Sequence, residues 1–510
     1  MIAADKVDMP PGHGTVTPKR HGLVTHYLRY STGSLLVITA GLVSFPILTR
    51  LLDNTQYGIL GYYDTWVLLA VSLGKLGAQH AVLRFYPHDG DAARLRSFST
   101  NLFYLPLAIS LLLWGAIVLG TLLVDAASGL RQSPMFWLAL GMMPMLVFAS
   151  MVEMVLRASE NSRLVMLTRV GWRWLELVLM LGAVLLLQHS AMAAYGGKML
   201  AAVLAVVFFV HWARRHLVYS RELLDPAMLR QGMLYGLPLL ANELIMVTLV
   251  SVDRLMLKNL LGDFAPVGIY TIGSSLAMQV NVFLSITLFE AFAPAANRLY
   301  DTEGPVAVRA LKERILLPMT YVSIGIAALL WCFGTDVIVA LSGHGKAASG
   351  PVFSWLGIVY ALQPVLMVAG YGLLLEKRSF KVLVLMASGL LLNVALNLWW
   401  IPLHGVMGAV YATAVSSLML ATAHCLLVPR ALLQLPQPRV VATAVAAAVL
   451  CVAGVWAGGL LDLRPGWARL MLGGSTAALL YALAVLTLDA RMRALLRRWW
   501  PSAGSANSAG

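Results

Sequence analysis

The stretch LYGLPLLANELIMVTLVSVDRLML, from Leu234 to Leu257, decides how this chain is organised. It is long enough to cross a bilayer as a helix, which needs about 20 mainly apolar residues. It also carries Glu243, Asp253 and Arg254, and an ionisable group at the centre of an inserted helix costs about 2.5 to 3.5 kcal/mol. Glu243 and Arg254 are eleven residues apart and therefore share one face of the helix. We interpret the segment as the first helix of a second lobe, with its polar face toward a central cavity.

The composition is that of a membrane protein. Of the 510 residues, 59% are hydrophobic and only 12% are charged, and the mean hydropathy is +0.79. A soluble protein of this size could not bury so much apolar surface, so we expect an all-α polytopic membrane protein. Residues 1–26 are polar, so the first apolar span is expected to act as its own targeting signal. The three cysteines are scattered and predict neither a disulfide framework nor a metal site.

The hydropathy pattern predicts about fourteen transmembrane helices joined by short loops. Proline or glycine marks several joints, as at Ser133-Pro134 and Gly350-Pro351. The expected spans are 28–50, 63–84, 101–124, 134–156, 168–188, 191–213, 232–258, 266–292, 314–334, 351–375, 380–401, 404–428, 438–461 and 468–488.

Lysine and arginine are divided unequally between the two sides of the predicted membrane. Of 37 such residues, 26 fall in tails and loops on the side of the N-terminus, six on the opposite side and five inside spans. By the positive-inside rule, the first side is cytoplasmic. We therefore expect a multi-pass protein of the inner (plasma) membrane with both termini in the cytoplasm and residues 335–350 outside. The net charge of +14 follows topology, so no nucleic-acid partner is expected.

An internal repeat divides the chain. The end of the first span reads LTRLLDNTQYGILGYYDTW (Leu48–Trp66), and the end of the seventh reads MLKNLLGDFAPVGIYTIGSS (Met256–Ser275), with a Gly-Ile pair at corresponding places. Both copies start on the cytoplasmic side, which predicts two parallel-repeat six-helix lobes plus two C-terminal helices. The expected boundaries are 1–26 for a cytoplasmic tail, 27–213 for the N-lobe, 214–231 for a cytoplasmic linker, 232–428 for the C-lobe, 429–488 for helices 13 and 14, and 489–510 for a second cytoplasmic tail.

Two stretches carry a resemblance to a known family. SFPILTRLLDNTQYGILGYYDTWVLLAVSLGKLGAQHAVLRFYP (Ser44–Pro87) and VDRLMLKNLLGDFAPVGIYTIGSSL (Val252–Leu276) resemble the hallmarks of Wzx-type polysaccharide flippases, in the multidrug, oligosaccharidyl-lipid and polysaccharide exporter superfamily. The resemblance implies a V-shaped two-lobe fold that moves an O-antigen, capsule or exopolysaccharide repeat unit outward by alternating access. It also implies the partners: a polyprenyl-diphosphate-linked glycan, membrane lipids, and the polysaccharide polymerase and chain-length machinery. Fourteen spans resemble the peptidoglycan-precursor flippases more than the twelve-helix drug exporters.

Other functional classes fit less well. The alternative within the superfamily, a cation-coupled multidrug or small-molecule antiporter, needs an acid deep in the first lobe, and the first span contains none. No HExxH, CxxC, P-loop or GxSxG motif occurs, and no loop is large enough for a catalytic domain, so we do not expect an enzyme. A membrane scaffold would leave the charges inside the spans unexplained.

Lys75 is the first candidate for a contact with cargo. It lies about twelve residues from either end of its predicted span, too deep for its ammonium group to reach the surface fully. Gln79 shares its face at helical spacing. The alternative is a structural ion pair between Lys75 and an acid on a neighbouring helix.

The remaining candidates lie in other spans. Arg254 is expected either to contact cargo or a gate, or to form a structural bridge. Arg29 is a further candidate, although snorkelling to the cytoplasmic surface explains it better. Asn281 completes the substrate-binding set. We expect no metal or resident cofactor, and place coupling to a proton or sodium gradient on Glu243 and Asp253.

Three more charged residues fall inside spans. Arg173 and Glu176 are spaced for a local ion pair, which we expect to be structural. Lys198 is expected to reach the periplasmic surface.

Overall fold

The computed structural model describes the backbone of residues 20–129 and 131–499, and this part of the chain contains helices and no strands. Side chains are described for these residues except 20–32, 34–35, 286–291 and 495–499. Eleven helices of the described part are long and apolar enough to cross a membrane. The number is twelve if the bent pair α2 (Asn54–Gly74) and α3 (Ala78–Phe85) counts as one span. The all-α polytopic fold is confirmed, whereas the predicted count of fourteen is not.

Short connections join the helices, and every predicted span falls on a helix or on neighbouring helical segments. The remaining bounds are α1 Arg20–Leu51, α4 Ala92–Phe98, the π-helix η1 Ser99–Tyr104, α5 Leu105–Ser128, α6 Pro134–Ala158, α7 Ser162–Leu186, α8 Ala191–His216, the 3₁₀ turn η2 Arg221–Leu223, α9 Pro226–Leu261, α10 Ala265–Glu303, α11 Pro305–Ser342, the 3₁₀ segment η3 His344–Ser349, α12 Gly350–Ala369, α13 Ser379–His404, α14 Val406–Leu427, α15 Pro438–Ala457, α16 Trp467–Arg469, the π-helix η4 Leu470–Gly474, α17 Ser475–Leu488 and α18 Ala490–Trp499.

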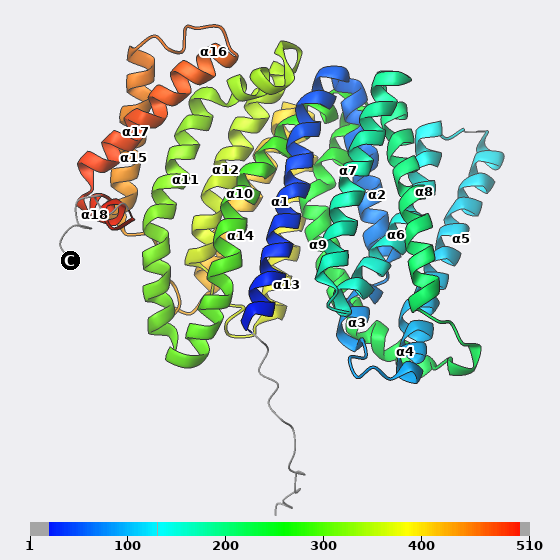
Figure 1. Ribbon diagram of the computed structural model, residues 1–510. Helices are drawn as coiled ribbons and strands as arrows, with labels where there is room; N and C mark the ends of the chain where they lie inside the picture. Colours follow the sequence, from blue (N-terminus) through cyan, green and yellow to red (C-terminus); the bar gives the residue numbers. More distant parts are fainter. Residues whose placement is uncertain (1–19, 130, 500–510) are drawn as a thin grey trace, which may run out of the picture.

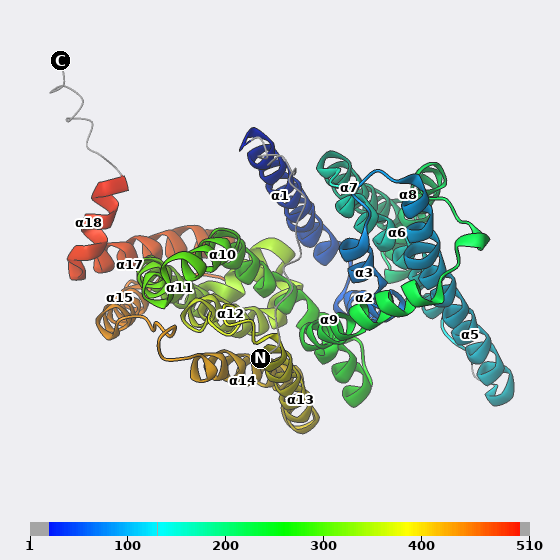
Figure 2. The same cartoon turned by 90° about the horizontal axis from the view of Figure 1, so that it is seen from below.

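Two bundles stand side by side (Figures 1 and 2). α1, α2, α3 and α5 to α8 form the first, and α10 to α14 form the second. α9 connects them, since it packs against α2 and α3 of the first bundle and against α13 of the second. α15 and α17 pack together at the outer edge beside α11, and α18 is seen end-on across their lower ends. The boundaries predicted for the lobes remain predictions.

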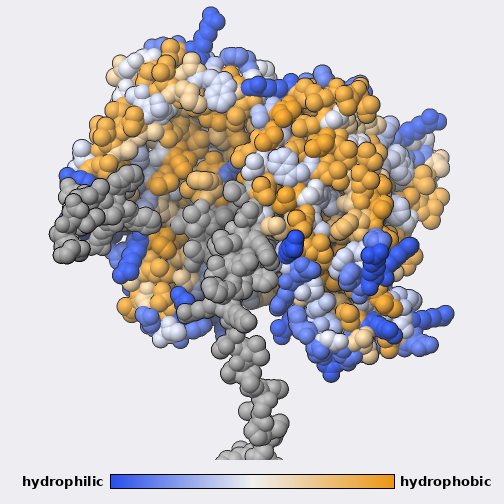
Figure 3. Space-filling view, viewed as in Figure 1, coloured by the Kyte–Doolittle hydropathy of each residue, from blue (hydrophilic) through white to orange (hydrophobic). Residues whose placement is uncertain are grey.

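The outer surface is built to face lipid. Apolar residues cover the middle of the face shown in Figure 3, and polar residues gather at its top and bottom. Leu112 on α5 and Leu186 on α7 are 74% and 85% exposed on the protein alone, which is stable only against hydrocarbon. The top of Figure 1 contains the end of α1 and the start of α2, and is therefore the predicted periplasmic side.

The ends of the bundles are fixed by polar contacts to backbone carbonyls. Asn101 of η1 donates to the Leu223 carbonyl at 2.8 Å and accepts from the N–H of Asp225 at 2.8 Å, which ties the 214–231 segment to the first bundle. In the second bundle, the fully buried Lys312 donates to the carbonyls of Ala369 and Leu432, the former at 3.1 Å. These bonds satisfy carbonyls that the helix ends leave free.

The two copies of the repeat meet at the predicted periplasmic end. A Cβ atom on Gly58 of α2 would lie 1.9 Å from the carbonyl oxygen of Phe264, and one on Gly268 of α10 would lie 1.8 Å from that of Asn54. Each glycine therefore packs against the carbonyl four residues before the other glycine, as a pseudo-twofold axis requires. Only glycine permits this approach of two helix backbones.

Polar contacts close the same end. Arg50 at the end of α1 donates to the carbonyls of Leu341 and Ala340 at 2.9 and 2.8 Å. Lys346 of η3 donates in return to the Leu52 carbonyl at 2.7 Å. Thr49 donates to the hydroxyl of Ser342 at 2.9 Å. The bundles thus cap each other's helix C-termini, where cations are favoured.

The second predicted span is not one continuous helix. α2 ends at Gly74 and α3 begins at Ala78, with a bend of 50° between them. Leu76 and Gly77 have φ values of +55° and +76°, and such angles interrupt a right-handed helix. A Cβ atom on Gly77 would also lie 2.5 Å from the Gly236 carbonyl oxygen of α9. The bend therefore lies at a close backbone contact between the first bundle and α9.

A candidate cargo cavity between the bundles

A polar cavity of about 270 Å³ lies between the two bundles, just inside their closed, predicted periplasmic end. α1, α2, α7 and α8 supply one wall, and α9 and α10 supply the other. Its charged lining residues are Asp64, Arg173, Glu176, Lys198 and Arg254, and its uncharged polar ones include Ser44, Tyr57, Thr271, Ser275 and Gln279.

Local structure places Asp64 in this cavity. Asp53 caps α2 by accepting a hydrogen bond from the N–H of Gln56 at 2.7 Å. The helix that starts there puts Gly58 against α10, and Asp64 lies less than two turns further along. Its carboxylate accepts hydrogen bonds from Lys198 at 2.8 Å and from the Tyr195 hydroxyl at 2.9 Å, both on α8.

Four of the five charges in the cavity are matched. Lys198 pairs with Asp64 at 2.8 Å, and Arg173 pairs with Glu176 at 3.1 Å on the same helix. We expected Lys198 to reach the periplasmic surface. This expectation is wrong, because Asp64 on the neighbouring helix α2 holds the ammonium group of Lys198 in the cavity. The predicted Arg173–Glu176 pair is present, and both residues line the cavity.

Arg254 differs from the other cavity cations. Within the described part of the chain, its side chain makes no ion pair or hydrogen bond, and its Nε is buried without a partner. A half-buried guanidinium with free N–H groups is costly unless an anion or water satisfies it. Arg254 is therefore the group in the cavity best prepared to bind an anion.

Lys75 and Gln79 form a separate cluster around Glu243. Glu243 on α9 accepts from Lys75 Nζ at 2.5 Å and from Gln79 Nε2 at 2.6 Å. His80 Nε2 lies 3.5 Å from the same carboxylate. The Lys75 and Glu243 side chains are only 13% and 22% exposed. Lys75 therefore forms an ion pair with Glu243 of α9, which is the alternative to a contact with cargo that the sequence analysis left open.

The other two candidate cargo residues lie elsewhere. Asn281 on α10 donates to Gln363 of α12 at 3.1 Å and accepts from Ser285 at 3.2 Å, so it packs inside the second bundle. Arg29 lies on α1, but its side chain is outside the described residues.

Asp253 faces away from the cavity, into the second bundle. It is 1% exposed and accepts hydrogen bonds from Asn397 at 2.6 Å, from Thr413 at 2.7 Å and from the Tyr270 hydroxyl. Asn397 also donates to Asn393 at 3.0 Å. The Oδ1 atom of Asn397 is buried without a partner in the described residues. A buried carboxylate beside a free carbonyl oxygen is a set of ligands suited to a small hard cation or a proton.

The sequence matches the profile of one known protein family. The profile of the family described as polysaccharide biosynthesis protein matches residues 25–299, more than half of the chain. The chain belongs to this family. The assignment made from the two hallmark stretches is confirmed. No curated protein matches the sequence.

Solved structures agree on the fold. The lipid II flippase MurJ in an inward closed conformation is similar over 92% of this chain and 99% of its own, with a TM-score of 0.68 and 10% identity. A multidrug resistance MATE family transporter in an inward-facing conformation is similar over 78% of this chain and 96% of its own, with a TM-score of 0.58 and 17% identity. At such identities the likeness establishes a shared fold and no shared cargo.

Proposed function

We propose that this protein is a flippase, and not an enzyme, that moves a lipid-diphosphate-linked oligosaccharide from the cytoplasmic to the periplasmic leaflet of the inner membrane. The observation that carries the proposal is Arg254, a cation in the cavity between the bundles whose N–H groups have no partner among the described residues. A guanidinium binds phosphate oxygens in a bidentate manner, and its interaction strengthens where water is scarce.

The charge balance of the cavity favours an anionic cargo. It has three bases, Arg173, Lys198 and Arg254, and two acids, Asp64 and Glu176. Both acids are already paired. A cationic drug would have to displace one of these pairs, whereas a diphosphate can use Arg254 directly. This argues against the antiporter, the second transport function that the fold permits.

The position of α1 suits a cargo with a lipid tail. α1 contacts the second bundle near its periplasmic end, through Phe45, Thr49 and Arg50. Seen from below, the rest of α1 stands at the edge of the molecule (Figure 2). We propose that the polyprenyl tail stays in the bilayer beside α1 while the head group occupies the cavity. The released glycan would then be available to a periplasmic polymerase.

Reconstitution tests the function. Proteoliposomes containing a fluorescent polyprenyl-diphosphate oligosaccharide should show transfer between leaflets, measured with an impermeant quencher. Arg254→Gln should slow transfer by about tenfold or more, because a hydrogen bond to a charged group contributes about 1.5 to 3 kcal/mol. Arg254→Lys should retain part of the rate, and the exposed Arg163→Gln on α7 is the matched control. Transfer at the control rate by Arg254→Gln would refute the role of this residue.

We further propose that Asp253, and not Glu243, couples transport to a proton or sodium gradient. Glu243 already accepts hydrogen bonds from Lys75 and Gln79. Asp253, in contrast, lies beside the Oδ1 atom of Asn397, which has no partner among the described residues. Asp253→Asn should remove the dependence of transfer on an imposed gradient, while downhill exchange of the lipid continues. A gradient dependence unchanged in Asp253→Asn, or absent in the wild type, would refute this assignment.

A further inference from the structure

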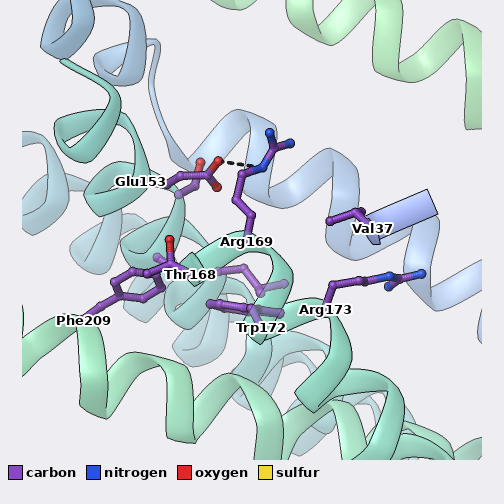
Figure 4. A pocket seen from close by; sticks show the side chains of 10 residues that line it. Val37, Glu153, Thr168, Arg169, Trp172, Arg173 and Phe209 are labelled. Carbon is purple, nitrogen blue, oxygen red and sulfur yellow. Dashed lines mark ion pairs between the residues drawn. The ribbon is translucent and has the colours of Figure 1, made fainter. Parts of the chain in front are cut away.

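A second cavity, of about 260 Å³, lies inside the first bundle among α6, α7 and α8, with Val37 of α1 at its edge (Figure 4). Trp172 and Phe209 form an aromatic wall, their rings 6.0 Å apart. Arg169 and Arg173 of α7 and Glu153 of α6 supply the charges. It is separate from the cavity between the bundles.

The positive charges in and beside this second cavity exceed what the carboxylate of Glu153 can neutralise, since Arg157, which does not line the cavity, pairs with Glu153 as well. The same oxygen of Glu153, Oε1, lies 2.6 Å from Arg157 Nη2 and 3.1 Å from Arg169 Nε. Arg157 Nε is buried with no partner in the described residues. Two guanidinium groups therefore share one carboxylate oxygen, so one positive charge and several N–H donors remain available to an anion.

Arg173 joins this cavity to the cargo cavity. It lines both of them, and it lies four residues after Arg169, on the same face of α7. Figure 4 shows the two side chains leaving α7, that of Arg169 toward Glu153 and that of Arg173 past Val37. Arg157, Arg169 and Arg173 thus mark a line of cations from the predicted cytoplasmic end of α6 to the cargo cavity.

We infer that this cavity is a second anion-binding subsite, which holds the diphosphate of the cargo before it moves past Arg173 to Arg254. This inference rests on the proposed function. The aromatic wall excludes water from one side of the subsite, which strengthens charged hydrogen bonds there. Glu153 keeps the two arginines in place when the subsite is empty, and the incoming diphosphate competes with it for the same N–H groups.

Because the diphosphate competes with Glu153 for the same arginines, one variant is expected to bind the anion more tightly than the wild type does. Binding of inorganic pyrophosphate and of a short polyprenyl diphosphate to the purified full-length protein should be measured for wild type, Arg169→Gln, Glu153→Gln and the control Arg163→Gln. Arg169→Gln should weaken binding to the subsite about tenfold or more. Glu153→Gln should tighten it several-fold, because it frees both guanidinium groups, and no loss of folding can mimic that gain. In an Arg254→Gln background, residual binding should persist and disappear when Arg169→Gln is added.

Three results would overturn the inference, and they point to different errors. If Arg169→Gln and Glu153→Gln bind both ligands as Arg163→Gln does, while Arg254→Gln alone abolishes binding, the function stands and the subsite does not exist. If Glu153→Gln binds more weakly and unfolds at a lower temperature, Glu153 is only a structural brace. If the wild type binds pyrophosphate and not the lipid, the subsite accepts free phosphate and its proposed cargo is wrong.

Discussion

The two bundles meet at Gly58 and Gly268, at the predicted periplasmic end, so an added methyl group there should open this end. In Gly58→Ala the new Cβ would lie 1.9 Å from the Phe264 carbonyl oxygen and 2.8 Å from the Gly268 nitrogen. These are backbone atoms of a helix and cannot rotate aside. Since a carbon needs about 3.3 Å from a carbonyl oxygen, α2 and α10 must separate by more than 1 Å.

The free-energy cost of Gly58→Ala should be large enough to make the closed state the minor one. Overpacking of a close contact costs about 1 to 3 kcal/mol, and the absence of any movable side chain here places the cost at the upper end. A loss of about 3 kcal/mol shifts the equilibrium away from the closed state by about a hundredfold. In the open state that alternating access requires, α2 and α10 would be apart and the new methyl would meet no clash.

Spin labels at His189 and His344 would report this change. Both residues are exposed, and they follow α7 in the first bundle and α11 in the second. The distance between the labels should be short in the wild type and predominantly long in Gly58→Ala. Gly120→Ala is the control, because a Cβ there meets nothing within 4 Å. A distance distribution in Gly58→Ala identical to that of the control would refute the reasoning.

Further predictions concern stability and topology. Lys75→Gln should destabilise the purified protein by about 2 to 4 kcal/mol because it strands the carboxylate of Glu243, and adding Glu243→Gln should restore part of the loss; equal thermal unfolding of single variant and wild type would contradict this. Lys312→Met should lower stability by about 1 to 3 kcal/mol, since it leaves two buried carbonyls without a donor; an unchanged unfolding temperature would show that the carbonyls find other partners. Cysteines at the exposed His344 and Glu222 should be labelled by an impermeant reagent only from outside and only from inside the cell, respectively; the reverse pattern would invert the topology.

The spans and the internal repeat could be predicted from the sequence, because both appear as local patterns of apolar residues and glycines. The repeated Gly58-Ile59 and Gly268-Ile269 pairs turned out to mark the contact between the two copies, where only glycine fits. The sequence also placed Arg254 on the polar face of its helix, and this residue lines the cavity. Its role was left open between a contact with cargo or a gate and a structural bridge.

The ion pairs between different helices could not be predicted, because hydropathy does not order helices in space. Glu243 meets Lys75 across 168 residues of sequence, and Lys198 meets Asp64 across 134. The break after Gly74 also escaped prediction. Gly74 and Gly77 were visible in the sequence, but the positive φ of Leu76 and the close packing of Gly77 against Gly236 of α9 were not. These contacts are tertiary, and no local propensity encodes them.

The account depends above all on passage of the cargo between two bundles that must separate at the periplasmic end. The hydroxyl oxygens of Thr49 and Ser342 lie 2.9 Å apart across that end, so Thr49→Cys/Ser342→Cys should form a disulfide on oxidation in a background without Cys332, Cys425 and Cys451. In proteoliposomes with the fluorescent polyprenyl-diphosphate oligosaccharide, we predict that oxidation stops transfer and that reduction restores it. Transfer at an undiminished rate by the cross-linked protein would show that the lipid-linked glycan does not cross through this cavity.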